Sequence, residues 1–299
     1  MIDPGFGPVL VTGANGMLGS AFLRHAPTVM LGSARGTTGP LAFDITDQEA
    51  VESVFGQVRP LGVIHCAAFA SVDGCEADPT GARETNVMGP SNVASAAARC
   101  GAWMIYVSTD SVFDGSDGPY DESDPPRPIN IYSVTKLEGE QRVRDLCPQH
   151  LIVRTNFYGY RDPNGKSLGE WLIRELSHGK TLGGFTNVHF NPLFVDQVVE
   201  LTLDVWSSGR RGVVHLGSEG TCSKYQFARE LARRCGFDPS LVEPAFLDSK
   251  VLSAPRPRDT TLDIMSASRS LSRIMPSRES GLVEFARCVC SLTSKSSPG

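Results

Sequence analysis

The amino-acid sequence predicts an α/β fold: a doubly wound parallel sheet with helices on both faces, followed by a smaller, irregular cap. Three observations support this prediction. Short apolar runs alternate with helix-like stretches through the first half of the chain, a rhythm typical of parallel sheets. A glycine-rich turn joins the first apolar run to the first helix-like stretch. After about residue 154 the alternation stops, and glycines, aromatic residues and short elements dominate.

The elements of the first half follow one another in regular order. Strands are expected over residues 8–12, 28–31, 61–68, 103–108 and 151–155. Helices are expected over residues 17–25, 48–57, 79–100 and around 136–146. The helix at 48–57 carries apolar side chains on one face, and Gly101 is a typical C-terminal stop for the helix before it.

The second half is expected to form the cap. Its clearest helix covers residues 224–235, and prolines at 255, 257 and 276 interrupt the last stretch. The predicted division is therefore a nucleotide-binding domain at 1–153 and a cap at 154–290, with some cap segments returning to the sheet. Residues 291–299 are expected to form a flexible tail.

The composition excludes several classes of protein. Of 299 residues, 40% are hydrophobic, and 28 basic against 33 acidic side chains give a net charge of −5. This balance disfavours a nucleic-acid binder or a protein of anionic membrane surfaces. No apolar run reaches the ~18 residues of a membrane span, and residues 1–8 lack a signal-peptide pattern.

Cysteine and histidine spacing gives no sign of a metal site. The eight cysteines form no CxxC pair, and the six histidines show no HExxH spacing. The sequence also has no Asn-x-Ser/Thr sequon. We therefore expect reduced, structural cysteines, a cytoplasmic protein and no bound metal.

The glycine-rich turn has the spacing Gly-x-x-Gly-x-x-Gly, at Gly13, Gly16 and Gly19. Glycines allow the backbone to turn tightly and approach a pyrophosphate, whose charge then lies at the N-terminus of the helix. Three turn glycines also occur by chance. Here a strand precedes them and a helix follows, which is the context of a dinucleotide-binding Rossmann domain.

Residues after the second predicted strand indicate the cofactor. No acidic residue for a ribose 2′-hydroxyl ends that strand; Ser33, Ala34 and Arg35 follow it instead. Because an arginine there accommodates a 2′-phosphate, the sequence favours NADPH, with NADH as the alternative and a solvated Arg35 as the competing interpretation. Asp44 is expected at a strand end near the adenine, whereas Asp47 suits the N-cap of the next helix.

A Tyr-x-x-x-Lys pair provides candidate acid–base chemistry. Tyr132 and Lys136 lie at i and i+4, on one face of a helix. An ammonium near a phenol is expected to lower the pKa of the tyrosine from about 10, so that it serves as a proton donor. The pair alone is common on surfaces. The catalytic interpretation is supported by the hydroxyls of Ser108 and Thr109. They lie at the end of a predicted central strand, and parallel sheets bind ligands at that end of their strands.

These motifs together resemble those of the extended short-chain dehydrogenases/reductases, and within them those of the dTDP-4-dehydrorhamnose reductases. The resemblance covers roughly residues 8 to 290, and its STD-VFDG and NxYxxxK motifs are highly specific. The matching segments are 12–19, 44–47, 63–69, 86–90, 108–115, 119–122, 128–140, 153–155, 215–217, 225–228 and 256–263.

The resemblance implies roles for individual residues. The implied catalytic set is Thr109, Tyr132 and Lys136. The implied cofactor-binding residues are Gly13, Asn15, Gly16, Met17 and Leu18 at the pyrophosphate, Asp44 and Ile45 at the adenine, Cys66, Ala67 and Ala68 at the nicotinamide ribose, and Ser108 with Tyr132 and Lys136. The implied substrate-binding residues are Asp110, Asn156 and Arg256, the last for the diphosphate of a sugar nucleotide, although a structural loop arginine is nearly as plausible.

The implied activity is NADPH-dependent reduction of a nucleotide-linked 4-keto sugar, by an enzyme that could form a homodimer. Two alternatives remain. One is a nucleotide-sugar epimerase or dehydratase on the same scaffold. The other is a non-catalytic NADP-binding regulator, like the regulatory subunit of methionine adenosyltransferase. The segment Asn156-Phe157-Tyr158-Gly159 lacks the family's usual tryptophan, and residues 185–193 also depart from its pattern, which suggests a different sugar.

Overall fold

The central feature of the fold is one sheet of six parallel strands. The computed structural model describes residues 8–26, 30–34, 41–248 and 252–293. The strand order is β10-β5-β4-β3-β1-β2. The strands are β1 (Val9–Thr12), β2 (Met30–Ser33), β3 (Gly62–His65), β4 (Trp103–Val107), β5 (His150–Thr155) and β10 (Gly212–Leu216). The predicted doubly wound parallel sheet is confirmed.

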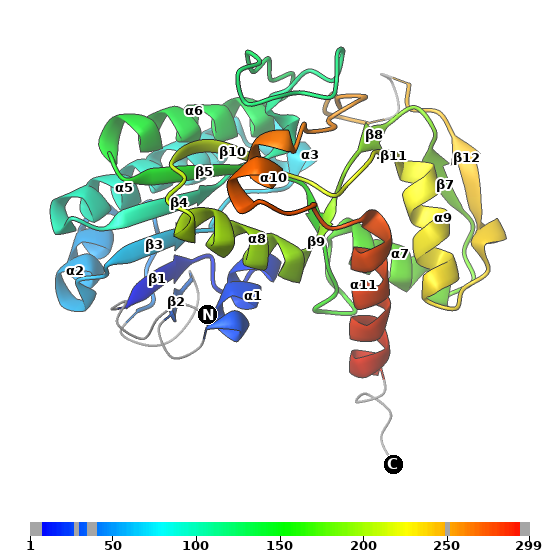
Figure 1. Ribbon diagram of the computed structural model, residues 1–299, viewed down its shortest axis with the longest axis horizontal. Helices are drawn as coiled ribbons and strands as arrows, with labels where there is room; N and C mark the ends of the chain where they lie inside the picture. Colours follow the sequence, from blue (N-terminus) through cyan, green and yellow to red (C-terminus); the bar gives the residue numbers. More distant parts are fainter. Residues whose placement is uncertain (1–7, 27–29, 35–40, 249–251, 294–299) are drawn as a thin grey trace.

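Helices cover both faces of the sheet (Figure 1). They are α1 (Met17–His25), α2 (Gln48–Val58), α5 (Gly89–Cys100), α6 (Ile131–Leu146) and α8 (Val195–Ser207). Successive side chains of a strand point to opposite faces. In β1, Val9 and Val11 therefore pack with α1 and α8, whereas Leu10 packs with α2 and α5. Burial on both faces explains why the inner strands are rich in apolar residues.

The sequence was right about most elements of the first half and wrong about the continuity of one helix. The stretch 79–100 divides into α4 (Pro79–Arg83), the π-helical turn η1 (Glu84–Met88) and α5, after a short α3 (Val72–Ala77). Pro90 lies in the first turn of α5 and has no N–H group for regular helical hydrogen bonding. The second strand is β2 at 30–33 rather than 28–31; residues 27–29 lie outside the described part of the chain.

The second half holds more regular structure than expected. Its helix at 224–235 is confirmed as α9, but α7, α8, α10 and α11 were not anticipated. The further elements are β6 (Phe157–Tyr158), α7 (Leu168–Ser177), β7 (Leu182–Phe185), β8 (His189–Phe190), β9 (Leu193–Phe194), β11 (Cys222–Ser223), α9 (Lys224–Arg234), η3 (Pro239–Leu241), β12 (Val242–Ala245), α10 (Met265–Leu271) and α11 (Arg278–Thr293). Elements α7, α9, β7 and β12 lie together at one end of the molecule (Figure 1).

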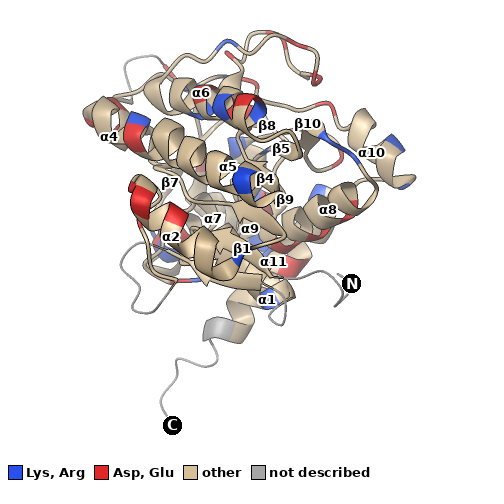
Figure 2. Ribbon diagram, turned by 90° about the vertical axis from the view of Figure 1, so that its left-hand side faces the viewer, with Lys and Arg blue, Asp and Glu red and all other residues tan. Residues whose placement is uncertain are grey.

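Two segments of the second half return to the first. Strand β10 pairs with β5 in the main sheet, and α8 packs against α1 in the same apolar core. On the side of the molecule that carries α2, α4 and α6, basic and acidic residues are interspersed (Figure 2). None of the helices in the described residues is long and apolar enough to cross a membrane.

Candidate active site

The glycine turn lies at the point where the strand order reverses, between β1 and β3. Gly13 has a φ of +69°, and a Cβ there would lie 2.6 Å from the backbone nitrogen of Ala67. A Cβ on Gly19 would lie 2.3 Å from the Gly13 carbonyl oxygen. Helix α1 begins after Gly16 with no side-chain cap, which leaves its first N–H groups available to an anion. The turn therefore fits a pyrophosphate at a topological switch point.

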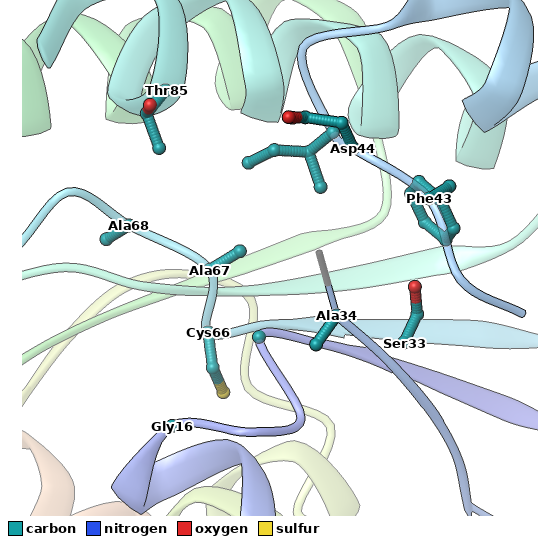
Figure 3. A pocket seen from close by; sticks show the side chains of 11 residues that line it. Gly16, Ser33, Ala34, Phe43, Asp44, Cys66, Ala67, Ala68 and Thr85 are labelled. Carbon is teal, nitrogen blue, oxygen red and sulfur yellow. The ribbon is translucent and has the colours of Figure 1, made fainter. Parts of the chain in front are cut away.

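A first cavity of about 220 Å³ opens beside this turn (Figure 3). It brings together the ends of β1, β2 and β3 with the loop before α2. Seven residues implied by the resemblance line it: Gly13, Gly16, Asp44, Ile45, Cys66, Ala67 and Ala68. Ser33, Ala34, Phe43 and Thr85 complete its lining. The mostly small, uncharged wall suits an adenosine moiety. Arg35, on which the preference for NADPH depends, lies outside the described residues.

The two aspartates before α2 have separate roles. The Asp47 side chain accepts a hydrogen bond from the Ala50 N–H and caps α2, as predicted. Asp44 accepts hydrogen bonds from the backbone N–H and the hydroxyl of Thr46, at 3.0 and 2.9 Å, and also lines the cavity. The geometry therefore holds the Asp44 carboxylate at the cavity rim.

A second cavity, of about 620 Å³, shares Gly13, Gly16, Cys66 and Ala68 with the first. It extends the groove toward the ends of β4 and α6. The implied residues that it adds are Met17, Leu18, Ser108, Tyr132 and Lys136. Asn15 stays outside its lining, and its carbonyl accepts a hydrogen bond from Arg161. Lys166, from the segment before α7, places an unpredicted cation in the same cavity.

Tyr132 and Lys136 project from the first two turns of α6. Asn130 caps this helix by accepting a hydrogen bond of 2.9 Å from the Ser133 N–H. The Lys136 ammonium donates to the Val107 carbonyl at 2.8 Å and lies 4.1 Å from the centroid of the Tyr106 ring. Burial lowers the pKa of Lys136 to about 8, although Glu140 opposes the shift.

The expected lowering of the tyrosine pKa is wrong for this structure. Burial raises the pKa of Tyr132 to about 12, and the hydrogen bond with Thr109 only partly offsets it. The charge of Asp110 adds to this rise in the pKa of Tyr132. Tyr132 is therefore a neutral phenol near pH 7, a state suited to donating a proton.

Beneath the cavity floor lies a buried ion pair that orients Ser108. The Ser108 hydroxyl donates to Glu140 at 2.6 Å. Arg154 donates to both carboxylate oxygens of Glu140, at 2.9 and 2.8 Å. Arg154 and Glu140 are almost fully buried. The hydroxyl that lies next to Tyr132 is that of Thr109, which is also hydrogen-bonded to Asp110 and lines none of the cavities described.

Asp110 holds the residues around Thr109. Its Oδ1 atom accepts hydrogen bonds from the hydroxyls of Thr109 (3.1 Å) and Ser111 (3.2 Å). Its Oδ2 atom accepts from the Asn156 amide (2.9 Å) and the Thr260 hydroxyl (2.6 Å). Asp110 is 1% exposed and lines none of the three cavities described. The structure thus places this carboxylate behind the site rather than at its surface.

A third cavity of about 400 Å³ lies next to the second and shares Leu168 with it. Asn156 and Arg256, implied as substrate-binding, both line it. Arg256 also donates to the Asp73 carboxylate at 2.8 Å and to the Ala254 carbonyl at 2.7 Å. One wall is apolar and comes from the second half of the chain: Trp171, Leu172, Leu182, Phe185, Val188, Ala228, Val242 and Leu247.

Several residues of this third cavity were missed from the sequence. Lys224 and Trp171 stand at the start of α9 and in the first turns of α7, where a single lysine or tryptophan carries no distinctive pattern. The only local signals were the capping boxes that begin these helices, at Ser167 and Ser223. Among the described residues, no group of three or more His, Cys, Asp or Glu side chains is placed to hold a metal ion.

Comparisons with known proteins show which family the chain resembles. A family model described as "RmlD substrate binding domain" matches residues 7–289. A "probable low-salt glycan biosynthesis reductase" of Haloferax volcanii is 35% identical over 284 residues, covering 91% of this chain and 95% of that protein. The dTDP-4-dehydrorhamnose reductase of Mycobacterium tuberculosis is 35% identical over 285 residues, covering 90% and 88%.

Solved structures extend the likeness to the whole fold. The crystal structure of a dTDP-4-dehydrorhamnose reductase from Bacillus anthracis, in complex with NADP, matches with a TM-score of 0.85 and 30% identity. The match covers 94% of this chain and 98% of that one. The resemblance read from the sequence is confirmed: the chain belongs to the RmlD substrate binding domain family.

Proposed function

We propose that the protein is an NADPH-dependent reductase of a nucleotide-linked 4-keto sugar, similar to dTDP-4-dehydrorhamnose reductase. The observation that carries the proposal is the meeting of three parts at one sheet edge. A glycine-lined groove ends at Tyr132 and Lys136, and a separate cavity with an apolar wall adjoins it at Leu168. A two-substrate reaction between a dinucleotide and a second, partly apolar ligand needs this arrangement.

The groove supports a dinucleotide because its first and second cavities share four lining residues and run past the N-terminus of α1. Gly13 and Gly16 would lie against the pyrophosphate, with Met17 and Leu18 beside them. Asp44 and Ile45 would border the adenine, and Cys66, Ala67 and Ala68 the nicotinamide ribose. When bound there, the nicotinamide nucleotide supplies a hydride to the ketone carbon. The preference for the 2′-phosphorylated form is assigned to Arg35.

Side chains of this protein would bind the ketone oxygen and transfer a proton to it. The Tyr132 hydroxyl would donate a hydrogen bond to the ketone oxygen. The Thr109 hydroxyl, which donates its one proton to Asp110 in this structure, would have to turn from that carboxylate to donate a second. Tyr132, neutral near pH 7, gives its proton to that oxygen as the carbonyl becomes an alcohol. Lys136 stands one turn further along α6; its ammonium, which donates to the Val107 carbonyl in this structure, would have to turn toward Tyr132 to stabilise the tyrosinate left behind. A proton from solvent then restores the phenol.

One position that distinguishes dehydratases from reductases holds no base in this chain. Removing a proton beside the ketone requires a base. The nucleotide-sugar dehydratases that this chain resembles around Thr109 and Asp110 carry a glutamate as the next residue; here that residue is Ser111, whose hydroxyl donates to Asp110. Two other residues, Cys66 and His189, are alternative candidates for the base. Burial raises the pKa of the Cys66 thiol to about 12, and His189 lines none of the three cavities described. These features favour simple reduction over dehydration or epimerisation.

Turnover without a partner protein tests the proposal. The purified chain is mixed with NADPH and a panel of dTDP- and UDP-linked 4-keto sugars, and NADPH absorbance is followed together with the product's stereochemistry. The proposal expects NADPH to be consumed with at least one sugar nucleotide, in a 1:1 ratio to alcohol formed. NADP binding without turnover on any of them would favour the regulatory alternative.

A further inference from the structure

The third cavity carries more positive charge than its own residues neutralise. The described residues of its lining include two cations, Lys224 and Arg256, and no carboxylate. Arg256 is held by Asp73, to which it donates at 2.8 Å. Lys224 has no such partner: within the described part of the chain, its ammonium makes no hydrogen bond or ion pair.

The surroundings of Lys224 are largely apolar. It is the first residue of α9, and its Nζ atom lies 3.3 Å from the centroid of the Phe190 ring, which is itself buried. Burial lowers the pKa of this ammonium to about 8, while the charge of Asp110 opposes the shift. Asp110 already accepts hydrogen bonds from four other side chains. Lys224 is therefore a partly desolvated cation with incomplete compensation, which is costly unless a ligand provides an anion.

We propose that Lys224 binds a phosphoryl oxygen of the nucleoside diphosphate in the substrate, and so selects diphosphate-linked sugars. The inference rests on the proposed function and adds to it the residue that recognises this charge. The cavity fits such a ligand in both character and size. Its apolar wall, with Trp171 and Phe185, suits a nucleobase, and its volume of about 400 Å³ lies in the usual range for ligand pockets.

The chemistry of the side chain also fits a phosphoryl group. A lysine ammonium acts as a compact point charge with three donors, and it binds phosphate without the planar geometry that arginine requires. A sugar hydroxyl would leave the charge uncompensated. A diphosphate brings two negative charges to a wall whose second cation, Arg256, already has a carboxylate partner.

The test measures binding, without turnover, by calorimetric titration of dTDP, UDP, thymidine and UDP-glucuronic acid, a nucleotide-linked sugar acid. Lys224→Met keeps the length of the side chain and removes its charge, whereas Lys224→Arg keeps the charge. Lys180→Met is the matched control, because Lys180 is 61% exposed and pairs with Glu175 on the surface. Titration with NADPH, which the proposal places in the other two cavities, reports whether each variant is folded.

Lys224→Met is expected to weaken dTDP or UDP binding by about 10- to 100-fold, the range for a lost hydrogen bond to a charged group. Thymidine and NADPH affinities should stay unchanged. Lys224→Arg should restore most of the nucleoside diphosphate affinity, and Lys180→Met should match the wild type.

The outcomes that would contradict the proposal distinguish the role of Lys224 from the proposed reductase function. Wild-type binding of dTDP or UDP with equal binding by Lys224→Met overturns the role of Lys224 and leaves the reductase proposal intact. A wild type that binds neither overturns both. Weaker binding only of a nucleotide-linked sugar acid would make a sugar carboxylate the partner and overturn the phosphoryl assignment. Parallel loss of NADPH binding in Lys224→Met, not rescued by Lys224→Arg, would show a purely structural role.

Discussion

The Asp110 carboxylate accepts a hydrogen bond of 2.6 Å from the Thr260 hydroxyl, which comes from a segment 150 residues later in the sequence. The same carboxylate accepts a hydrogen bond from Thr109, the hydroxyl proposed to hold the ketone. One buried acid therefore links the end of the central strand β4 to the wall of the substrate cavity. This link makes Asp110 a positioning residue in our account, and its effect on catalysis runs through Thr109.

Asp110→Asn should lower kcat by about 10- to 100-fold while NADPH affinity changes less than about twofold. The amide keeps one acceptor oxygen but places an NH₂ group where hydroxyl and amide donors now point, so Thr109 loses its fixed orientation. Steady-state kinetics and NADPH titration measure the two effects separately. Asp121→Asn is the control, since Asp121 accepts similar hydrogen bonds in an exposed turn. An unchanged kcat in Asp110→Asn would remove this carboxylate from the account.

Tyr132→Phe removes the proposed proton donor and keeps the ring. Turnover should fall about 10²- to 10⁴-fold, the usual range for general acid catalysis, with NADPH binding retained. Lys136→Met should lower both turnover and NADPH affinity, because its ammonium lines the cofactor groove and anchors to the Val107 carbonyl. Single-turnover measurements at saturating NADPH distinguish the two variants. Near-normal turnover in Tyr132→Phe would show that another group donates the proton.

Gly13→Ala should abolish most cofactor binding and destabilise the fold by roughly 1–3 kcal/mol. The added Cβ would meet the Ala67 backbone at 2.6 Å, and a φ of +69° disfavours alanine. Gly56→Ala makes the opposite prediction. Gly56 lies within α2 with open space around its Cβ position, so alanine there should stabilise the fold by about 0.5–1 kcal/mol. Chemical denaturation compares both variants with the wild type; equal effects would contradict the steric argument.

Two buried histidines should make the fold sensitive to acid. Burial lowers the pKa of His65 and of His215 from 6.5 to about 3. Between pH 6.5 and about pH 3, these histidines bind protons in the unfolded state but not in the folded state. The free energy of unfolding therefore has its full value above about pH 6.5 and decreases as the pH falls toward 3.

Each such histidine contributes a slope of about 1.4 kcal/mol per pH unit inside this window. His215→Phe should therefore reduce the slope of unfolding free energy between pH 4 and 6 by about that amount. His25→Phe, at an exposed position at the end of α1, should leave it unchanged. Reversible denaturation at several pH values gives the slopes, and equal slopes in His215→Phe and the wild type would refute the prediction.

The sequence predicted the sheet correctly, and most of its candidate cofactor residues line two adjoining cavities, because both predictions depend on local patterns. The glycine spacing, the apolar strands and the Tyr132–Lys136 pair each lie within a few residues of one another. The break at Glu84–Met88 was missed, since a π-helical turn differs from an α-helix by one hydrogen-bond register and not by composition. Helix α8 was missed because its residues are buried on most sides, which hides the amphipathic period.

The residues that line the third cavity could be predicted only in part. Asn156, Thr260 and Lys224 meet around one cavity but stand more than 30 residues apart in the sequence, so no spacing reveals them. The position of Asp110 behind the site could not be predicted from the sequence either. A carboxylate at a strand end reads as a ligand-binding group, and only the structure places four donor groups around it.

Isotope labelling in deuterated water tests the central claim most directly. The enzyme is incubated in D₂O with NADPH and the nucleotide-linked 4-keto sugar that supports turnover, and the product is examined by NMR and mass spectrometry. The account predicts one NADPH oxidised for each alcohol formed, with hydrogen from the cofactor at the former ketone carbon and no deuterium on the carbons that flank it. Enzyme-dependent deuterium at those flanking carbons, with no net oxidation of NADPH, would contradict reduction and establish carbon-acid chemistry instead.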